Sequence, residues 1–408
     1  MTVSASDLDE ICLRGLLRWL SKGPRSPYNG PVAPVRHEDI DALRMWWALS
    51  RPVGALAARL ATRPREVSPA LDGFRREVSG EIPGPPDAAA SALLQAITLD
   101  PSAFVVTEIS ATWLAGPNRV LAKTLDAARK ALRAAALHVR GGLFDGPAKE
   151  RLAILDDALK VAPMRDLLAT PAGRARIGSH ERRQAAKARA PLYRLSWDCA
   201  STLAGIDALQ PESVAALLAG DTLPGMETWR KFELAVLLEV GDALAGATGH
   251  PCVLDASFAA GRPAAKVGDI EIRWQRAIPQ RPNADLDPGE IMAKDLAASL
   301  GAAAGTARAD IVIERAGRIL SIIECKWFGD PDSAHGAILD AVPQIVGYAR
   351  DAAYAQGEAA GDILSRSVVA LAHRGLAPLR MGAPVGCLGF VDLGGTVLSP
   401  WAATIATI

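Results

Sequence analysis

The stretch from Ala309 to Phe328, ADIVIERAGRILSIIECKWF, constrains the fold of this chain more than any other. Two apolar runs, Ile311–Ile313 and Ile319–Ile323, flank a short polar break, and this pattern predicts a β-hairpin. Because side chains alternate along a strand, Glu324 and Lys326 share one face. The hairpin therefore ends by presenting an acid and a base side by side.

Asp310 lies at the open end of the partner strand, and the turn decides which residue faces it. A three-residue loop over Ala316–Arg318 places Asp310 opposite Glu324, whereas a two-residue loop places Ala309 there. Under either pairing an Asp, a Glu and a Lys converge at one end of a mostly hydrophobic hairpin.

This convergence suits metal-dependent hydrolysis of phosphodiester bonds. Neighbouring carboxylates repel each other unless a cation lies between them, and hard divalent metals such as Mg²⁺ prefer oxygen ligands. An ammonium two residues along the strand is placed to orient or deprotonate an attacking water, or to stabilise the transition state. The alternative is a hairpin with a surface salt bridge, because a three-residue E-x-K match is common by chance.

Asp310 followed by Glu324-Cys325-Lys326 resembles the core motif of the PD-(D/E)XK, restriction-endonuclease-like nuclease superfamily. Ala309 stands where the Pro of the name would be, at a position that carries no chemistry. The resemblance implies that Asp310 and Glu324 bind Mg²⁺ or Mn²⁺ together with the backbone carbonyl of Cys325. It also implies that Lys326 positions and activates the water.

An upstream helix from about Met226 to Ala245 is predicted, with Glu233 at the centre of its apolar stripe. The stripe consists of Trp229, Val236, Leu237, Val240 and Leu244, and Glu239 and Asp242 lie on the opposite side. A carboxylate buried there is costly unless it is paired or bound to a metal. The resemblance implies that Glu233 joins the metal site, and the alternative is a buried Glu that is paired with an Arg.

After the hairpin, the next helix is predicted to start near Pro343, because helices accept proline in their first turn. Gln344 and Tyr348 follow at i and i+4 and so share one face. Q-x-x-x-Y after an E-x-K strand resembles an extra motif of several nucleases of the superfamily. It implies that Gln344 orients the site and that Tyr348 lies near the bound strand. The resemblance covers roughly residues 224–393.

The formal net charge is zero, but it is unevenly distributed. From Arg119 to Arg194 the chain has 17 Lys and Arg against 7 Asp and Glu. Within this region we expect an exposed helix that contacts nucleic-acid phosphates. The basic residues concerned are Arg182, Arg183, Lys187 and Arg189. A merely solvated charged face is the alternative.

The N-terminal half carries a second resemblance. Strands are predicted at Phe74–Ile82 and Phe104–Ser110, with a helical piece around Ala88–Ile97 between them. Gly80-Glu81-Ile82, Ser102–Val106 and Pro117–Leu121 resemble the N-terminal part of proteins related to the nuclease subunit of McrBC-type modified-cytosine restriction systems. No G-x-x-x-x-G-K-[ST] loop is present, so motor work would need a separate NTPase or defence-system partner. An ordinary helical domain with a small β-ribbon is the alternative.

The cysteine spacing, the apolar runs and the first residues of the chain indicate its cellular compartment. Five Cys residues without a C-x-x-C pair indicate neither a disulfide framework nor a zinc knuckle. No apolar run approaches the roughly 18–20 residues of a membrane helix, and the acidic start does not fit a signal peptide. We expect a cytoplasmic protein that does not associate with membranes.

These observations predict an α/β (α+β) protein in two parts. Residues 1–215 are expected to form a mostly helical module with a small β element and the basic segment, for nucleic-acid or partner binding. Residues 216–408 are expected to form a PD-(D/E)XK-like nuclease domain, a mixed sheet flanked by helices. The expected activity is Mg²⁺- or Mn²⁺-dependent hydrolysis of DNA in restriction or phage defence. RNA as substrate and a homodimer stay open, as does a non-catalytic nucleic-acid-binding or assembly subunit that retains the nuclease fold.

Overall fold

The computed structural model describes residues 4–21, 37–136, 144–223, 225–255, 258, 261–299, 308–328, 333–372, 385–389 and 398–408. The chain divides into two compact units that are interleaved along the sequence. Unit 1 comprises Met1–Trp46, Ala134–Ala148 and Gly205–Ile408, and unit 2 comprises Trp47–Arg133 and Lys149–Ala204. The division expected from the sequence is linear instead, with one boundary after residue 215.

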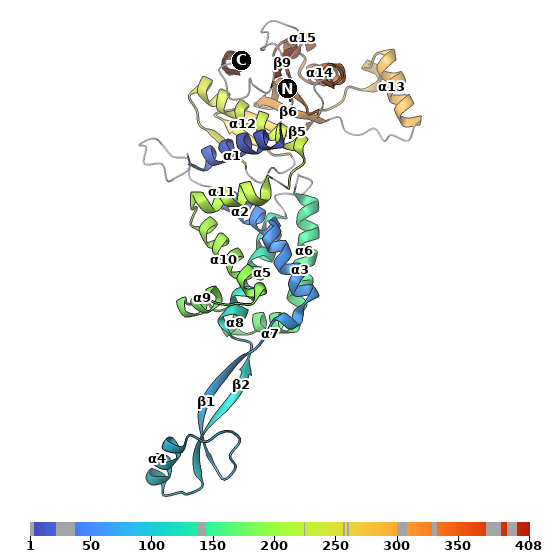
Figure 1. Cartoon of the computed structure of the whole chain (residues 1–408). Coiled ribbons are helices and arrows are strands. Elements are labelled where there is room, and N and C mark those ends of the chain that lie inside the picture. The colour runs from blue at the N-terminus through green and yellow to red at the C-terminus, as the bar shows by residue number, and fades with distance from the viewer. Residues whose placement is uncertain are drawn as a thin grey trace. The chain divides into compact units, whose positions relative to one another are not determined.

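Unit 1 is built on a seven-stranded mixed sheet in the order β3-β4-β5-β6-β7-β8-β9 (Figure 1). The pairs from β3 to β7 are antiparallel, and β7, β8 and β9 run parallel. The strands are β3 (Cys252–Leu254), β4 (Ala265–Val267), β5 (Ile270–Ala277), β6 (Arg308–Arg315), β7 (Arg318–Lys326), β8 (Val368–Leu371) and β9 (Gly386–Gly389). The mixed α/β class expected from the sequence is confirmed.

Helices cover both faces of this sheet. The helices and helical turns that lie wholly or partly in unit 1 are α1 (Ala5–Ser21), α2 (His37–Leu49), α11 (Pro211–Leu217), the π-helical turn η2 (Leu218–Thr222), α12 (Thr228–Thr248), the 3-10 turn η3 (Asn283–Asp285), α13 (Pro288–Ser299), α14 (Ala334–Gln356), α15 (Ala360–Leu364) and α16 (Leu398–Thr407). Figure 1 shows α12 and α14 on opposite sides of the central strands. Gly241 lets α12 approach closely, because a Cβ there would lie 2.9 Å from Cys252 Sγ.

The α14 face carries a core cluster. Val312 and Ile322 of the hairpin pack there with Ala341, Ile345 and Ala349 of α14. Because Asp310, Glu324 and Lys326 alternate in phase with Val312 and Ile322, they follow the same face toward the end of the hairpin. The apolar residues of β6 and β7 thus hold the polar residues at one edge of a buried layer.

The apolar stripe predicted on α12 needs one correction. Val236, Leu237, Val240 and Leu244 are buried, but Trp229 is 40 % exposed. Trp229 lies in the first turn of α12, where its ring contacts the guanidinium of Arg230. Helical periodicity treats every turn of α12 as equally buried, but the first turn, which contains Trp229, is partly exposed.

The side of α12 opposite the stripe is covered by another helix rather than left to water. Both α1 and α16 pack against α12. Glu239 forms an ion pair with Arg14 of α1 at 3.5 Å, and Asp242 forms one with Arg18. The acids that interrupt the hydropathy of α12 therefore bind a neighbouring helix.

The β6–β7 hairpin resolves the alternative turns in an unexpected way. Arg315 pairs with Arg318, so the loop consists of Ala316 and Gly317, both with left-handed φ values of 51° and 81°. Such a two-residue turn matches the twist of the strands. A bulge between Ile313 and Glu314 then shifts the register, and Ile311 pairs with Ile323. Continuing this register by one residue brings Asp310 opposite Glu324.

The predicted start of the helix after the hairpin was wrong. Helix α14 runs from Ala334 to Gln356 and contains Pro343 in its interior. Proline costs an interior helix one backbone hydrogen bond, but two turns already precede Pro343, and the buried Ala341 and Ile345 hold the helix on the sheet. Packing against the sheet therefore outweighs the local preference of proline for the first turn of a helix.

Unit 2 combines helices with a β-ribbon. Its elements are α3 (Arg51–Thr62), the 3-10 turn η1 (Pro64–Glu66), β1 (Ala70–Ser79), α4 (Ala88–Thr98), β2 (Ala103–Thr112), α5 (Gly116–Ala135), α6 (Asp145–Lys160), α7 (Ala162–Ala169), α8 (Pro171–Arg174), α9 (Ser179–Ala186) and α10 (Pro191–Asp207). Strands β1 and β2 pair antiparallel over their whole length. Both strands and the intervening helix were predicted, but β1 begins four residues before the predicted Phe74 and ends at Ser79, so the predicted end at Ile82 was wrong. Among the described residues, no helix is both long and apolar enough to cross a membrane.

Candidate active site

The carboxylate of Asp310 is fixed to the neighbouring strand. Its Oδ2 accepts the backbone N–H of Cys325 at 2.8 Å. This bond crosses from β6 to the residue between Glu324 and Lys326, so the predicted motif is assembled by one contact. Asp310 is half-buried and Glu324 is buried, which places two carboxyl groups together in surroundings with little water.

Lys326 is held by two acceptors. Its Nζ donates to Glu324 Oε1 at 2.9 Å and to Gln344 Oε1 of α14 at 2.7 Å. Gln344 is exposed, so the ammonium lies at the border between the buried carboxylates and solvent. The remaining oxygen, Glu324 Oε2, is buried and has no hydrogen-bond partner within the described part of the chain. An orphaned carboxylate oxygen is costly, and a bound cation would satisfy it.

Glu233 reaches the same cluster from α12, with the polar partners that burial demands. Its Oε2 accepts the indole N–H of Trp274, and it also accepts the side-chain amide of Gln275 at 2.9 Å. The same amide donates to Asp310 Oδ1 at 3.1 Å. Glu233 is therefore linked to Asp310 through Gln275, and the ring of Trp274 is held edge-on against Phe258 with the centroids 5.1 Å apart.

Burial raises the pKa values of all three carboxyl groups, and the charge of Asp310 raises those of the other two further. Burial, reinforced by Asp310, raises the pKa of Glu233 to about 8, and the same two causes raise that of Glu324 to about 7. Burial also raises the pKa of Asp310, against the N–H of Cys325 and the charge of Lys326. One ammonium does not balance three carboxylates, so the ionised cluster carries a net negative charge that a divalent cation would neutralise.

The carboxylates of the cluster fit a hard divalent cation in part. Two carboxylates, an orphaned buried oxygen and an excess of negative charge are what Mg²⁺ or Mn²⁺ binds. No group of three or more His, Cys, Asp or Glu side chains among the described residues is arranged to hold one ion together. Asp310 and Glu324 are therefore the direct candidate ligands, and the amide of Gln275 stands between Asp310 and Glu233.

Tyr348 follows Gln344 on α14 but makes a different contact. Its hydroxyl donates to the backbone carbonyl of Arg308, at the start of β6, at 2.9 Å. Burial and the nearby carboxylates Glu324 and Asp310 raise the pKa of Tyr348. The hydroxyl therefore stays protonated and holds the strand that carries Asp310.

Neither models of protein families nor curated proteins match this chain. The assignment of a function consequently depends on the geometry of the cluster and on the chemistry of its side chains. The nuclease superfamily remains a resemblance of sequence motifs.

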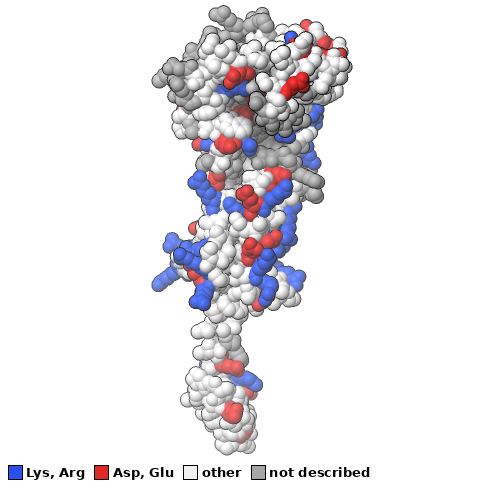
Figure 2. Space-filling view, turned by 90° about the vertical axis from the view of Figure 1, so that its right-hand side faces the viewer, with Lys and Arg blue, Asp and Glu red and all other residues white. Residues whose placement is uncertain are grey.

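The predicted basic segment lies in unit 2. Arg182 and Arg183 belong to α9, Lys187 ends that helix, and Arg189 follows it. All four side chains are exposed. Figure 2 shows Lys and Arg side chains projecting from unit 2 on the face it displays. Glu181, the acid within this run, is instead paired with Arg119 of α5.

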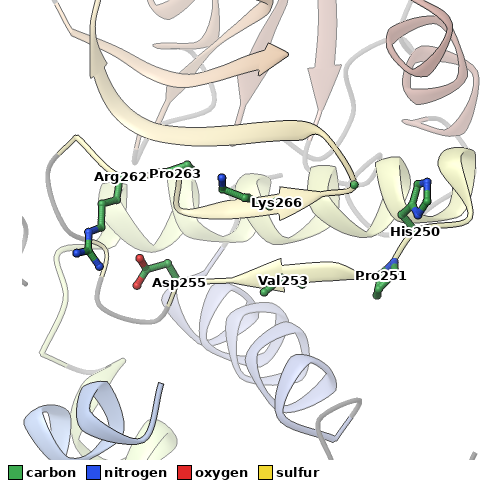
Figure 3. Close-up of a pocket in the computed structure, with 8 residues that line it drawn as sticks. His250, Pro251, Val253, Asp255, Arg262, Pro263 and Lys266 are labelled. Atoms are coloured by element: carbon green, nitrogen blue, oxygen red, sulfur yellow. The ribbon is translucent and has the colours of Figure 1, made fainter. Parts of the chain in front are cut away.

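A separate cavity of about 470 Å³ lies on β3 and β4, at the edge of the sheet (Figure 3). It is lined by His250, Pro251, Val253, Asp255, Arg262, Pro263, Lys266 and Gly268. None of the clustered carboxylates contributes to it. Its charged lining residues are Asp255, Arg262 and Lys266, so the cavity carries both signs of charge.

Sequence analysis missed two residues of the cluster, Trp274 and Gln275. The run DIEIRWQRA predicts strict alternation, which would send these neighbours to opposite faces. Gln275 instead has a left-handed φ of 52°, and both side chains reach Glu233. A polar Gln beside a Trp at the end of a strand was the only signal that the sequence offered.

Proposed function

We propose that this protein is a metal-dependent nuclease that hydrolyses phosphodiester bonds of DNA. The proposal rests on the convergence of Asp310, Glu324 and Lys326, fixed by the Asp310–Cys325 and Lys326–Glu324 contacts. The raised pKa values of Glu233 and Glu324 support it, because perturbed carboxylates gather where charge is needed for chemistry.

Each side chain has a role that follows from its contacts. Asp310 and Glu324, with the Cys325 carbonyl, would hold Mg²⁺ or Mn²⁺, which would supply polarisation of the scissile phosphate and charge neutralisation. Lys326 uses two of its three donors on Glu324 and Gln344 and has the third for a water or a phosphate oxygen. Gln344 orients this ammonium, and Tyr348 fixes the strand that carries Asp310.

A direct assay tests the proposal. The full chain is incubated with supercoiled plasmid, linear duplex, single-stranded DNA and RNA, with Mg²⁺, Mn²⁺ or chelator. We expect DNA cleavage that requires metal and that disappears in Asp310→Asn, which keeps the size of the side chain. Cleavage that survives chelation or the substitution contradicts the proposal, as does the absence of cleavage by the unmodified chain.

The second candidate function is nucleic-acid binding without turnover, as an assembly subunit of a defence or repair complex. The exposed basic segment of unit 2 favours it, because phosphate contacts need no catalytic group. Equal retention of DNA by the unmodified chain and by Asp310→Asn, with no cleavage by either, would select this function. A restriction or phage-defence role and a separate NTPase partner belong to the proposal through the resemblance of the N-terminal half alone.

A further inference from the structure

Gln275 has the most unusual position in the cluster. It is an exposed side chain on a backbone of left-handed φ, 52°, which a residue with a Cβ rarely adopts. Its neighbours Trp274 and Arg276 pair with Ile311 and Ala309 of β6, at the level of Asp310. Strained backbone is kept where the surrounding contacts require it, and the contacts here are to two carboxylates.

The orientation of the Gln275 amide follows from its partners. Glu233 Oε2 and Asp310 Oδ1 lie 2.9 Å and 3.1 Å from Gln275 Nε2. An amide nitrogen only donates hydrogen bonds, so the NH₂ group rather than the carbonyl faces both oxygens. Its two N–H donors are matched by two acceptors. A neutral amide thus occupies the point between Glu233 and Asp310.

We propose that Gln275 is a positioning residue that competes with the cation for Glu233 and Asp310 and so sets the cation affinity of the site. The inference deepens the proposed function and rests on it. A cation held by Asp310 and Glu324 that uses Asp310 Oδ1 has to displace one amide N–H, and a cation that also recruits Glu233 Oε2 has to displace the other. Being exposed, the Gln275 side chain can swing toward solvent, whereas Glu233 is buried and cannot follow.

The decisive measurement is the Kd for Mn²⁺, determined by calorimetric titration of the full chain at one fixed pH. Gln275→Gly is the main variant, because glycine accepts the left-handed backbone, and Gln275→Ala is the second. Removing the competing donors should tighten Mn²⁺ binding about tenfold, on the scale of one charge-assisted hydrogen bond. A Kd that is unchanged or weaker in Gln275→Gly overturns the proposal.

The matched control is Gln95→Ala in unit 2. Gln95 also donates two hydrogen bonds, to the carbonyls of Pro101 and Ala103, but it contacts no carboxylate of the cluster. Its loss should leave the Kd for Mn²⁺ unchanged. A tenfold change in this control as well would show a general effect of stability and would overturn the specific role of Gln275.

A double-mutant cycle in chelator separates this inference from the proposed function. Thermal midpoints are compared for the unmodified chain, Gln275→Gly, Glu233→Gln and the double variant. If Gln275 bridges Glu233 and Asp310, Gln275→Gly should lower the thermal midpoint by several degrees less in the Glu233→Gln background than in the unmodified chain. Additive shifts of the thermal midpoint would overturn the bridge. If the unmodified chain binds no Mn²⁺, the proposed function and the competition both fail. If it binds Mn²⁺ and the Gln275→Gly variant binds equally well, only the competition fails.

Discussion

Asp310 Oδ2 accepts the backbone N–H of Cys325 at 2.8 Å, which joins the two strands of the hairpin at the point where their charged residues meet. The donor belongs to the main chain of β7, so strand register fixes where the Asp310 carboxylate finds it. The bond leaves Asp310 Oδ1 for Gln275. A shift of one residue in register would break both the contact and the cluster.

The first prediction concerns Lys326. Changing Lys326 to Ala should reduce DNA cleavage by about 10²–10³-fold, the scale for loss of one catalytic group. The substitution removes the donor that Glu324 and Gln344 position. Cleavage rates at saturating Mg²⁺ measure the effect. Lys266→Ala is the control, since Lys266 forms a similar bond to Glu271 on the same sheet but outside the cluster. Near-normal cleavage by Lys326→Ala rules out the assigned role.

The second prediction concerns the charge state of Glu233. Its folded pKa of about 8 lies above the value of an unfolded Glu, so the protonated carboxyl is favoured by folding. Its contribution is complete below the unfolded pKa and is lost as the pH rises through about 8. In chelator, the stability of the unmodified chain should fall between pH 5 and pH 8 relative to Glu233→Gln. The difference should reach a few kcal/mol, at about 1.4 kcal/mol per pKa unit.

Thermal unfolding of both proteins across that pH range measures this loss. At pH 8 the Glu233→Gln variant should be at least as stable as the unmodified chain. Mn²⁺ should then stabilise the variant less, since ligand binding stabilises in proportion to affinity for the native state. Parallel pH profiles of the two proteins would show that burial does not shift the titration of Glu233.

The third prediction concerns the basic segment of unit 2. Replacing Arg182, Arg183, Lys187 and Arg189 together by Ala should weaken DNA binding equally for all sequences. It should also flatten the slope of log affinity against log salt, because fewer counterions are released.

Fluorescence anisotropy at several salt concentrations measures this slope. The control replaces Lys130, Arg133, Lys160 and Arg165, which also lie in unit 2 but are paired with acidic neighbours. It removes the same charge, so a nonspecific field effect would flatten both slopes alike. If only the substitutions in the basic segment change the slope, the phosphate contacts belong to that segment.

The fourth prediction concerns Glu314, which is 2 % exposed. It is paired with Arg273 at 2.6 Å and Arg276 at 3.1 Å. Glu314→Ala removes the buried acceptor that two guanidinium groups share and leaves Arg273 paired with Glu271, so the free energy of unfolding should fall by about 3 kcal/mol, the low end for a broken buried pair. Urea denaturation measures it. Glu227→Ala removes the exposed pair with Arg230 and should cost about 0–1 kcal/mol. Equal losses would show that burial does not strengthen the Glu314 pairs.

Several structural features of this protein follow from local patterns in its sequence. Two apolar runs around a polar break predicted the β6–β7 hairpin, and the alternation of side chains along a strand put Glu324 and Lys326 on one face. Helical spacing predicted α12 with Glu233 facing inward. Gln344 reaches Lys326 from α14, and the resemblance had implied a place for it near the site. These features depend on residues within a few positions of one another, where backbone geometry fixes the side-chain direction.

Only the tertiary structure decided how these elements meet. The two-residue turn alone would pair Ala309 with Glu324, and the bulge beyond Ile313 restored Asp310 to that place. The partners of Glu233 are Trp274 and Gln275 rather than an Arg, because a left-handed backbone turns both toward it. Pro343 remains inside α14 because the sheet holds that helix. Register and backbone strain are settled by contacts between residues far apart in the chain, and local periodicity carries no information about them.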